Sequence, residues 1–121
     1  MGRTIKLIAV AALLSGCASN PNIELLSSDD RGRLSEIEIF EGKPERQFEI
    51  VGPVTGLSCH RNANIAGDVS RDEAMEGIRI MAVQLKADAV INLACQKKSG
   101  TDWSNNCWAS VKCLGDAIRY Q

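Results

Sequence analysis

The sequence predicts a small α+β domain in which a sheet of about four strands carries one main helix on a face, stapled by two disulfides. Two segments with strand-like alternation come first, a segment with helical periodicity follows, and two further strand-like segments end the chain. The expected order is therefore strand, strand, helix, strand, strand. The chain is 45% hydrophobic and only 4% aromatic, which suits a single small core.

Residues 1–16 have the organisation of a bacterial export signal. Arg3 and Lys6 precede the apolar run LIAVAALL, which is too short to span a bilayer. The run ends in LSGC, which resembles the lipobox of bacterial lipoproteins. This resemblance implies cleavage before Cys17 and lipidation of that residue, which would anchor the protein to a membrane. Ala18 follows Cys17 where an aspartate would favour the inner membrane, so we expect the outer membrane. The alternative is an ordinary signal peptide with a chance cysteine.

Four cysteines remain once Cys17 is assigned to the anchor: Cys59, Cys95, Cys107 and Cys113. An even number in an oxidising compartment indicates two disulfides, and the spacing alone leaves three pairings open. No C-x2-C pair occurs and His60, beside Cys59, is the only histidine. We therefore expect no metal site, no catalytic thiol pair and no cofactor.

Residues 17–33 are expected to be a lipidated N-terminus and a flexible tether, because Ala18–Arg33 is rich in Ser, Asn and Asp. The alternative for Ile23, Leu25 and Leu26 is that they dock weakly on the domain. The globular domain is expected over residues 34–121.

The first two strands are predicted over Leu34–Phe40 and Gln47–Cys59, both of which alternate apolar and polar residues. Gly52, Pro53 and Gly56 indicate a kink or an edge position in the second strand, because proline cannot donate to a ladder.

A helix is predicted after Ser70, which forms a capping box with Glu73. The apolar stripe expected to face the core consists of Met75, Ile78, Met81, Ala82 and Leu85. Arg79 and Lys86 are expected in solvent. The helix is expected to end near Ala87 or Asp88, where Asp88 can adopt the left-handed conformation.

A strand buried in the middle of the sheet is predicted over Ala89–Cys95, which is almost entirely apolar. A loop over Gln96–Asn106 then leads into the last strand, Cys107–Tyr120. Alternation predicts one apolar face and two residues, Ser110 and Lys112, pointing away from it. The apolar face comprises Cys107, Ala109, Val111 and Cys113.

The segments GPVTGLSC, AVQLKADAVINLAC and SGTDWSNNCWASVKCLGDAI resemble the globular domain of the RcsF family over residues 48–118. This resemblance implies an outer-membrane lipoprotein that faces the periplasm and senses envelope stress for the Rcs phosphorelay. It also implies a pairing of Cys59 with Cys107 and of Cys95 with Cys113. Because these pairs are not consecutive, we expect folding to depend on disulfide isomerisation.

The partners that the resemblance implies are an IgaA-like inner-membrane regulator, BamA and outer-membrane porins. The family's tether is longer, proline-rich and basic, whereas this one is short and mildly acidic, which argues against passage through a BamA or porin barrel. A partner surface is expected on the sheet or on the loop Gln96–Asn106, with Trp103 and Trp108 as aromatic anchors. The alternative is that these tryptophans merely cover a sheet edge or the disulfides.

The 14 Lys and Arg residues balance the 15 Asp and Glu residues along the chain, so we expect no nucleic-acid partner. No nucleophile and base pair is visible, so we expect no enzyme. A structural or assembly lipoprotein of the outer envelope, reusing the same domain without signalling, remains the alternative to a sensor.

Overall fold

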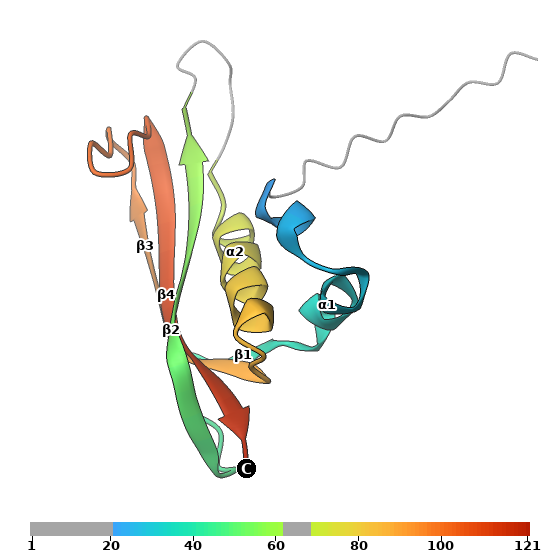
Figure 1. Ribbon diagram of the computed structural model, residues 1–121. Coiled ribbons are helices and arrows are strands. Elements are labelled where there is room, and N and C mark those ends of the chain that lie inside the picture. The colour runs from blue at the N-terminus through green and yellow to red at the C-terminus, as the bar shows by residue number, and fades with distance from the viewer. Residues whose placement is uncertain (1–20, 62–68) are drawn as a thin grey trace, which may run out of the picture.

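The computed structural model describes residues 21–61 and 69–121 (Figure 1). The chain starts with three short helices: η1 (Pro21–Leu25), α1 (Ser28–Arg33) and η2 (Leu34–Glu36). The elements that follow are β1 (Glu38–Ile39), β2 (Phe48–His60), α2 (Arg71–Gln84), β3 (Ala89–Lys98) and β4 (Ala109–Tyr120). The predicted order, the four-stranded sheet, the covering helix and the two disulfides are all confirmed.

The four strands lie in the order β1-β3-β4-β2, and β2 and β3 both pair antiparallel with β4. β1 is parallel to β3. β2 therefore forms an edge of the sheet, as Pro53 predicted, and its register shifts between Ile50 and Gly52. On the hairpin side, β3 continues to Lys98, beyond the predicted Cys95, whereas β4 begins at Ala109, two residues after the predicted Cys107.

The first strand is much shorter than the predicted Leu34–Phe40. Residues Leu34–Glu36 form a 3-10 turn, and only Glu38–Ile39 pair with β3. Leu34 and Ile37 both contact the core, and Ile37 is buried. A spacing of three residues places two side chains on one side of a 3-10 turn, so the same apolar residues satisfy either structure.

α2 begins at the predicted cap and ends earlier than predicted. Ser70 Oγ accepts a 3.1 Å hydrogen bond from the Glu73 amide. The helix ends at Gln84 with Leu85 as C-cap, and Lys86, not Asp88, adopts the left-handed conformation (φ 57°). The carboxylate of Asp88 instead accepts a 2.9 Å hydrogen bond from the amide of Tyr120.

The buried face of α2 is wider than the predicted stripe. Ile78 and Ala82 are buried as expected, but Met75 and Met81 are only half-buried and Leu85 is exposed. The remaining buried positions are Ala74, Gly77, Ile80 and Val83. They are buried because the sheet covers one side of α2 and the N-terminal helices lie along the other (Figure 1).

Pro21–Glu36 forms an arm that packs on the domain, so the prediction of a flexible tether is wrong for residues 21–33. Leu26 is 6% exposed and belongs to the main core, with Ile23 packed against it. Leu25 is 74% exposed. The side chain of Ser27 caps α1 by accepting from the Asp30 amide. The polar composition of this segment serves helix capping and surface contacts, and its few apolar residues are sufficient to dock it.

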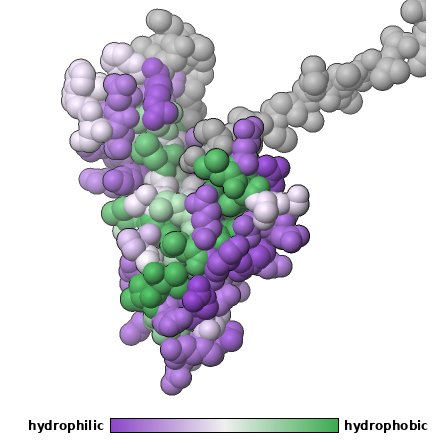
Figure 2. Space-filling model, viewed as in Figure 1, coloured by the Kyte–Doolittle hydropathy of each residue, from purple (hydrophilic) through white to green (hydrophobic). Residues whose placement is uncertain are grey.

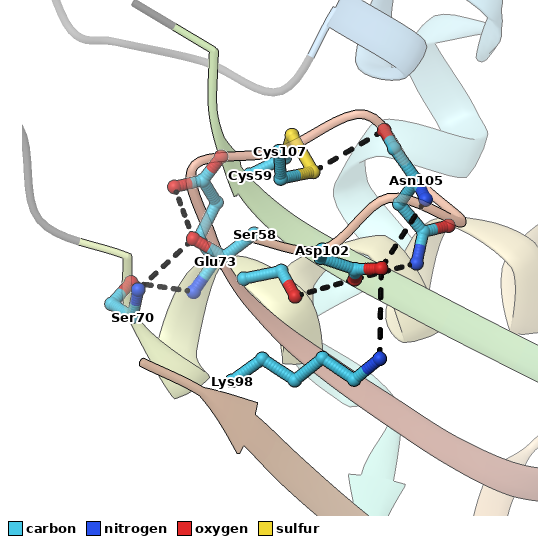
Figure 3. The surroundings of a disulfide bond; sticks show 9 residues. Ser58, Cys59, Ser70, Glu73, Lys98, Asp102, Asn105 and Cys107 are labelled. Carbon is cyan, nitrogen blue, oxygen red and sulfur yellow. Dashed lines mark hydrogen bonds and ion pairs between the residues drawn. A yellow bond between two sulfur atoms is a disulfide. The ribbon is translucent and has the colours of Figure 1, made fainter. Parts of the chain in front are cut away.

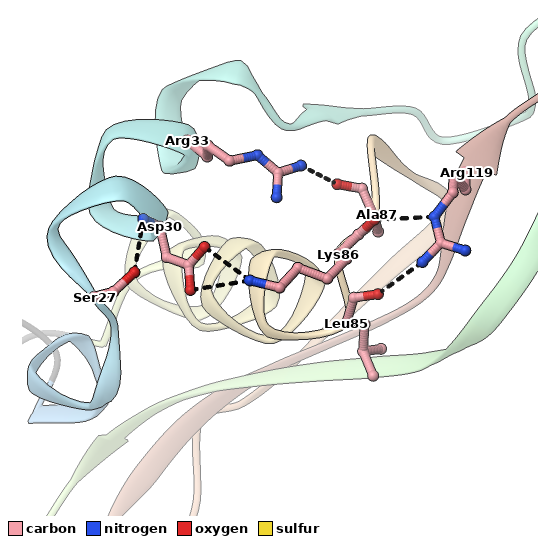
Figure 4. A network of polar contacts seen from close by, with 7 residues as sticks. All are labelled: Ser27, Asp30, Arg33, Leu85, Lys86, Ala87 and Arg119. Carbon is pink, nitrogen blue, oxygen red and sulfur yellow. Dashed lines mark hydrogen bonds and ion pairs between the residues drawn. The ribbon is translucent and has the colours of Figure 1, made fainter.

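Polar contacts hold the arm to the end of α2 (Figure 4). Lys86 Nζ lies 3.2 Å from Asp30 Oδ1, and the Arg33 guanidinium donates a 3.0 Å hydrogen bond to the Ala87 carbonyl. From β4, Arg119 donates to the carbonyls of Leu85 and Lys86 at 3.2 Å each. These arginines satisfy carbonyl groups that the end of the helix leaves without intrahelical partners.

The disulfide Cys95–Cys113 joins the middle of β3 to the middle of β4. The two residues are direct cross-strand partners with Cα atoms 4.0 Å apart, and Cys113 is fully buried. Cys113 and Cys95 both contact the main core, which α2 covers. This disulfide therefore fixes the register of the two central strands beneath the helix.

Candidate partner-binding surface

Trp103 and Trp108 lie in the connection between β3 and β4, and both are exposed. Trp103 has 84% of its surface exposed and Trp108 has 50%. Tryptophan combines a large apolar area with little conformational entropy, and an exposed pair is typical of protein contact sites. Whether the connection holds these side chains in a defined position depends on the residues beneath them.

Asp102 is the centre of the connection (Figure 3). Its side chain is almost completely buried and accepts hydrogen bonds from Ser110 Oγ (2.7 Å), Asn105 Nδ2 (2.8 Å) and the Asn105 amide (3.3 Å). Lys98 Nζ lies 3.8 Å from the same carboxylate. The backbones of Asp102 and Cys107 exchange two hydrogen bonds, at 2.7 and 2.9 Å. The turn that carries Trp103 is therefore closed at its base.

The hydrogen bonds from Asn105 and Ser110 lower the pKa of Asp102 from 3.8 to about 2, with a smaller contribution from the Lys98 charge. Burial of the carboxylate acts in the opposite direction and is outweighed. Asp102 is therefore ionised at neutral pH, and its charge orders the turn.

Ser110 lies in the buried base of this turn. The sequence predicted that its side chain would point away from the apolar face of the last strand. It does point to the face opposite Val111, but it is only 1% exposed because the Asp102 turn covers it. Lys112, two residues further along the same face, is exposed as predicted. The loop thus covers one end of the sheet face that α2 leaves open.

The disulfide Cys59–Cys107 connects the end of the turn to the end of β2 (Figure 3). Cys107 is 1% exposed, and the next residue, Trp108, donates its amide to the carbonyl of His60 at 2.7 Å. His60 is the last residue of β2 and is half-buried. The base of the tryptophan-bearing connection is therefore attached to two strands, β2 and β4.

On the other side of β2, Ser58 joins the disulfide end of the sheet to the start of α2. The predicted capping box is completed through this residue: the Ser70 amide donates to Ser58 Oγ at 2.9 Å, and Ser58 Oγ donates to Glu73 Oε2 at 3.0 Å. Ser58 is fully buried. A residue of the sheet thus stands between the two members of the capping box, an arrangement that local sequence spacing does not reveal.

The open face of the sheet continues from the turn toward the middle of the strands. Leu57, Lys112 and Gln96 form one cross-strand row, and Thr55, Leu114 and Ala94 form the next. Leu114 is 48% exposed. Lys112 and Leu114 lie opposite the α2 face because Cys113 between them and its cross-strand partner Gly56 lie beneath the helix. At the edge of the sheet, Thr55 Oγ1 lies 3.8 Å from Met81 Sδ of α2. We name Trp103, Trp108, Lys112 and Leu114 the tryptophan surface.

Sequence reasoning missed the residues that position the tryptophans, namely Asp102, Asn105 and Ser58. The available signal was the run TDWSNNC, in which an Asp precedes an Asn by three residues, a spacing typical of Asx-type turns. Cys17 lies outside the described residues. In residues 21–61 and 69–121, no helix has the length and apolar character to cross a membrane, and no three His, Cys, Asp or Glu side chains gather as metal ligands do.

No family model matches the chain. The chain is similar to the outer membrane lipoprotein RcsF of two Escherichia coli strains, with 27% identity over 132 residues that cover 96% of this chain and 96% of each relative. Among solved structures, a protein of unknown function from Pediococcus pentosaceus has a TM-score of 0.54 at 18% identity. That match covers 70% of this chain and 98% of the other, and at this identity it shows a shared fold alone.

Proposed function

We propose that this chain is an outer-membrane lipoprotein, anchored through lipid on Cys17, that senses envelope stress without catalysis and activates the Rcs phosphorelay through a protein contact in the periplasm. The observation that carries the proposal is the similarity to RcsF over 96% of both chains. A match confined to the domain would have left the N-terminal anchor without support.

The disulfide framework supports the same reading. Cys59–Cys107 and Cys95–Cys113 are interlaced along the chain, with sequence separations of 48 and 18 residues. This is the pairing that the family resemblance implies. A small α+β sheet does not in general require interlaced disulfides, so the pairing supports the resemblance. All four cysteines of the globular domain are thereby engaged in structural bonds, which fits a binding protein.

The docked arm limits how far the domain can hang from its anchor. Residues 17–33 were expected to be a tether, but the arm begins at Pro21, and only three residues lie between Cys17 and Pro21. The four Cα-to-Cα steps from Cys17 to Pro21 span at most about 14 Å. A partner of the tryptophan surface must therefore approach the domain near the outer membrane. Passage of so short a tether through BamA or a porin barrel is not part of the proposal.

The partner that we propose is an IgaA-like inner-membrane regulator, and the contact is the tryptophan surface. Trp103 is almost free of neighbours, while the turn beneath it is closed by Asp102 and the Cys59–Cys107 disulfide. An exposed aromatic side chain on an ordered turn loses little entropy on binding, which favours its use as an anchor.

The test is site-specific photo-crosslinking of the lipidated protein in the envelope of its own host. A photoreactive phenylalanine replaces Trp103 in one variant and Glu45 in the other. Glu45 is also exposed, but it lies in the turn between β1 and β2, at the other end of the sheet. Crosslinked proteins are identified by mass spectrometry with and without damage to the outer membrane.

We expect the Trp103 variant, and not the Glu45 variant, to capture an IgaA-like protein, with a yield that rises during damage. Capture of outer-membrane or peptidoglycan-assembly proteins alone, at a yield that stress leaves unchanged, would support the structural lipoprotein and contradict the sensor. Equal capture at both positions would contradict the assignment of the contact to the tryptophan surface.

A further inference from the structure

A groove of about 450 Å³ runs between the edge of β2 and α2, and across β2 it adjoins Lys112 and Leu114 of the tryptophan surface. Its lining residues include Thr55, Leu57, Gly77, Ile80, Met81 and, from the arm, Leu25. Figure 2 shows apolar surface on this face, in the view in which β2, α2 and the arm lie side by side in Figure 1. Leu25 is 74% exposed although it borders the groove, so an apolar rim stands open to solvent.

One wall of the groove is the free edge of a strand. Among the described residues, β2 pairs with β4 only. The amide of Thr55 points away from β4, since it contacts Met81 Sδ at 3.4 Å. Because outward and inward backbone groups alternate along an antiparallel strand, Leu57 and Cys59 also direct their amides and carbonyls to the free edge. Pro53, two residues before Thr55, has no amide to offer, so the usable edge starts at Thr55.

The contact at Thr55 is weak for a backbone amide. A thioether is a poor acceptor, and Met81 also receives the Thr55 hydroxyl at 3.8 Å. A peptide carbonyl would be a much stronger acceptor for the same amide. Met81 is an unbranched, half-buried side chain that can change rotamer at low cost and make room for one.

We propose that this groove binds an extended peptide segment of a partner protein, which adds to β2 as a further strand alongside α2. The free edge over Thr55–Cys59 specifies a backbone in β conformation, because only such a backbone presents donors and acceptors every second residue. The accessible apolar side chains of the groove, half-buried Met81 and exposed Leu25, favour an apolar side chain at alternate positions. Arg61, which follows β2, and Glu73 of α2 also line the groove, so its charged groups carry both signs.

The proposal does not rest on the proposed function, since it involves neither the two tryptophans nor a signalling pathway. The probe is a displayed library of nine-residue peptides, selected on the purified domain with its disulfides intact. A selected peptide is synthesised. Its dissociation constant is measured, and amide hydrogen exchange of the domain is compared with and without the peptide. We expect enrichment of peptides with alternating apolar residues, and at least tenfold slower exchange of the Thr55 and Leu57 amides when peptide is bound.

Backbone methylation of the peptide provides the matched control. Methyl groups on the amides of every second residue should abolish binding in one of the two registers and be tolerated in the other, because one set of amides pairs with β2 and the other faces away. Equal tolerance of both registers would overturn strand addition.

Two variants at one position test the protein side. Leu57→Pro removes one edge amide and should weaken peptide binding about tenfold, the effect of one lost hydrogen bond. Leu57→Ala retains the amide and should bind within about threefold of the unmodified protein. Should Leu57→Pro fail to fold, the methylated peptides still decide the question.

Sedimentation of the free protein tests the competing occupant, which is a second copy pairing edge to edge through β2. A dimer whose Leu57 amides are protected without peptide would overturn the proposal. Failure of the library to yield any peptide that slows exchange at Thr55 and Leu57 would overturn it as well. A monomer that binds the selected peptide in one methylation register supports it.

Discussion

Ser110 on β4 donates a 2.7 Å hydrogen bond to Asp102, and both side chains are buried on the sheet face that α2 leaves open. The pair connects a turn carrying an exposed tryptophan to the start of β4, at one end of the sheet. The rigidity of the proposed contact surface therefore depends on one carboxylate and its donors.

The charge of Asp102 makes the order of this turn dependent on pH. Its pKa is lowered from 3.8 to about 2, so its contribution to stability is complete above about pH 4 and is lost as the pH falls toward 2. Trp103 and Trp108 are the only tryptophans of the chain, so intrinsic fluorescence reports on this connection. We expect a fluorescence transition within that interval.

Asp102→Asn is the control for the pH experiment. The variant cannot ionise at this position, so it should show no such transition between pH 4 and 2 and should exchange the Asn105 amide faster at neutral pH. An identical fluorescence change in both proteins would contradict the role given to Asp102 and assign the transition to other carboxyl groups.

The arm is expected to contribute to the stability of the domain through Leu26. Leu26→Ala removes a side chain that is 6% exposed and should lower the free energy of unfolding by about 2–3 kcal/mol. Leu25→Ala is the matched control next to it, since Leu25 is 74% exposed and should change stability by less than about 0.5 kcal/mol. Chemical denaturation measures both, and equal values would mean that the arm does not dock in solution.

Close packing of α2 on β2 depends on the absence of a side chain at position 56. A Cβ placed on Gly56 would lie 2.7 Å from the carbonyl carbon of Ala74, which is helix backbone and cannot rotate away. We expect Gly56→Ala to lower the free energy of unfolding by about 1–3 kcal/mol. Gly52→Ala, whose Cβ would meet only Leu85 Cδ1 at 3.7 Å, should be tolerated. Thermal unfolding measures the stability of both variants. A tolerated alanine at 56 would contradict this packing.

The two disulfides are expected to differ in what they stabilise. In the chain-entropy model, the closed loops of 48 and 18 residues correspond to about 4 and 3 kcal/mol. Replacing both members of a pair by alanine should lower stability by amounts of this order. Only the loss of Cys59–Cys107 should also change tryptophan fluorescence in the native state, since it is the one of the two disulfides that is attached to the tryptophan-bearing connection. The same fluorescence change on removal of Cys95–Cys113 would contradict this division.

Interlaced pairing predicts slow oxidative folding. An oxidant that joins cysteines in chain order produces Cys59–Cys95, which must be exchanged before the native bonds form. Refolding of the reduced domain should therefore be accelerated by a disulfide isomerase, as measured by the appearance of the native disulfides. Refolding at the same rate with and without isomerase would contradict this expectation.

Local sequence was sufficient to predict an element where the residue pattern is compatible with only one type of secondary structure. Alternation over β2, the cap at Ser70 and the apolar run of β3 predicted those elements because each signal depends on near neighbours in the chain. Pro53 predicted an edge strand for the same reason, since its missing amide constrains the ladder wherever the strand lies. These features fixed the fold class and the order of its elements.

Other features were decided only when distant segments met. Leu34 and Ile37 fit a strand or a 3-10 turn equally well, and contact with the core selected the turn. The segment 21–33 has the composition of a linker, yet Leu26 joins the main core, and Asp30 and Arg33 find partners just after α2, at Lys86 and Ala87. No local rule foresees those contacts, because the partners lie more than fifty residues away in the chain.

The candidate surface divides in the same way. The sequence by itself determined that Trp103 lies in a polar loop and that Trp108 follows Cys107 directly, and it determined the number of cysteines available for pairing. Only the tertiary structure decided that Asp102 lies against Ser110 and Lys98, and that Ser58 stands between Ser70 and Glu73. The physical reason is that a buried polar group must find its partner in space, and its position in the chain does not say which groups the fold will bring to it.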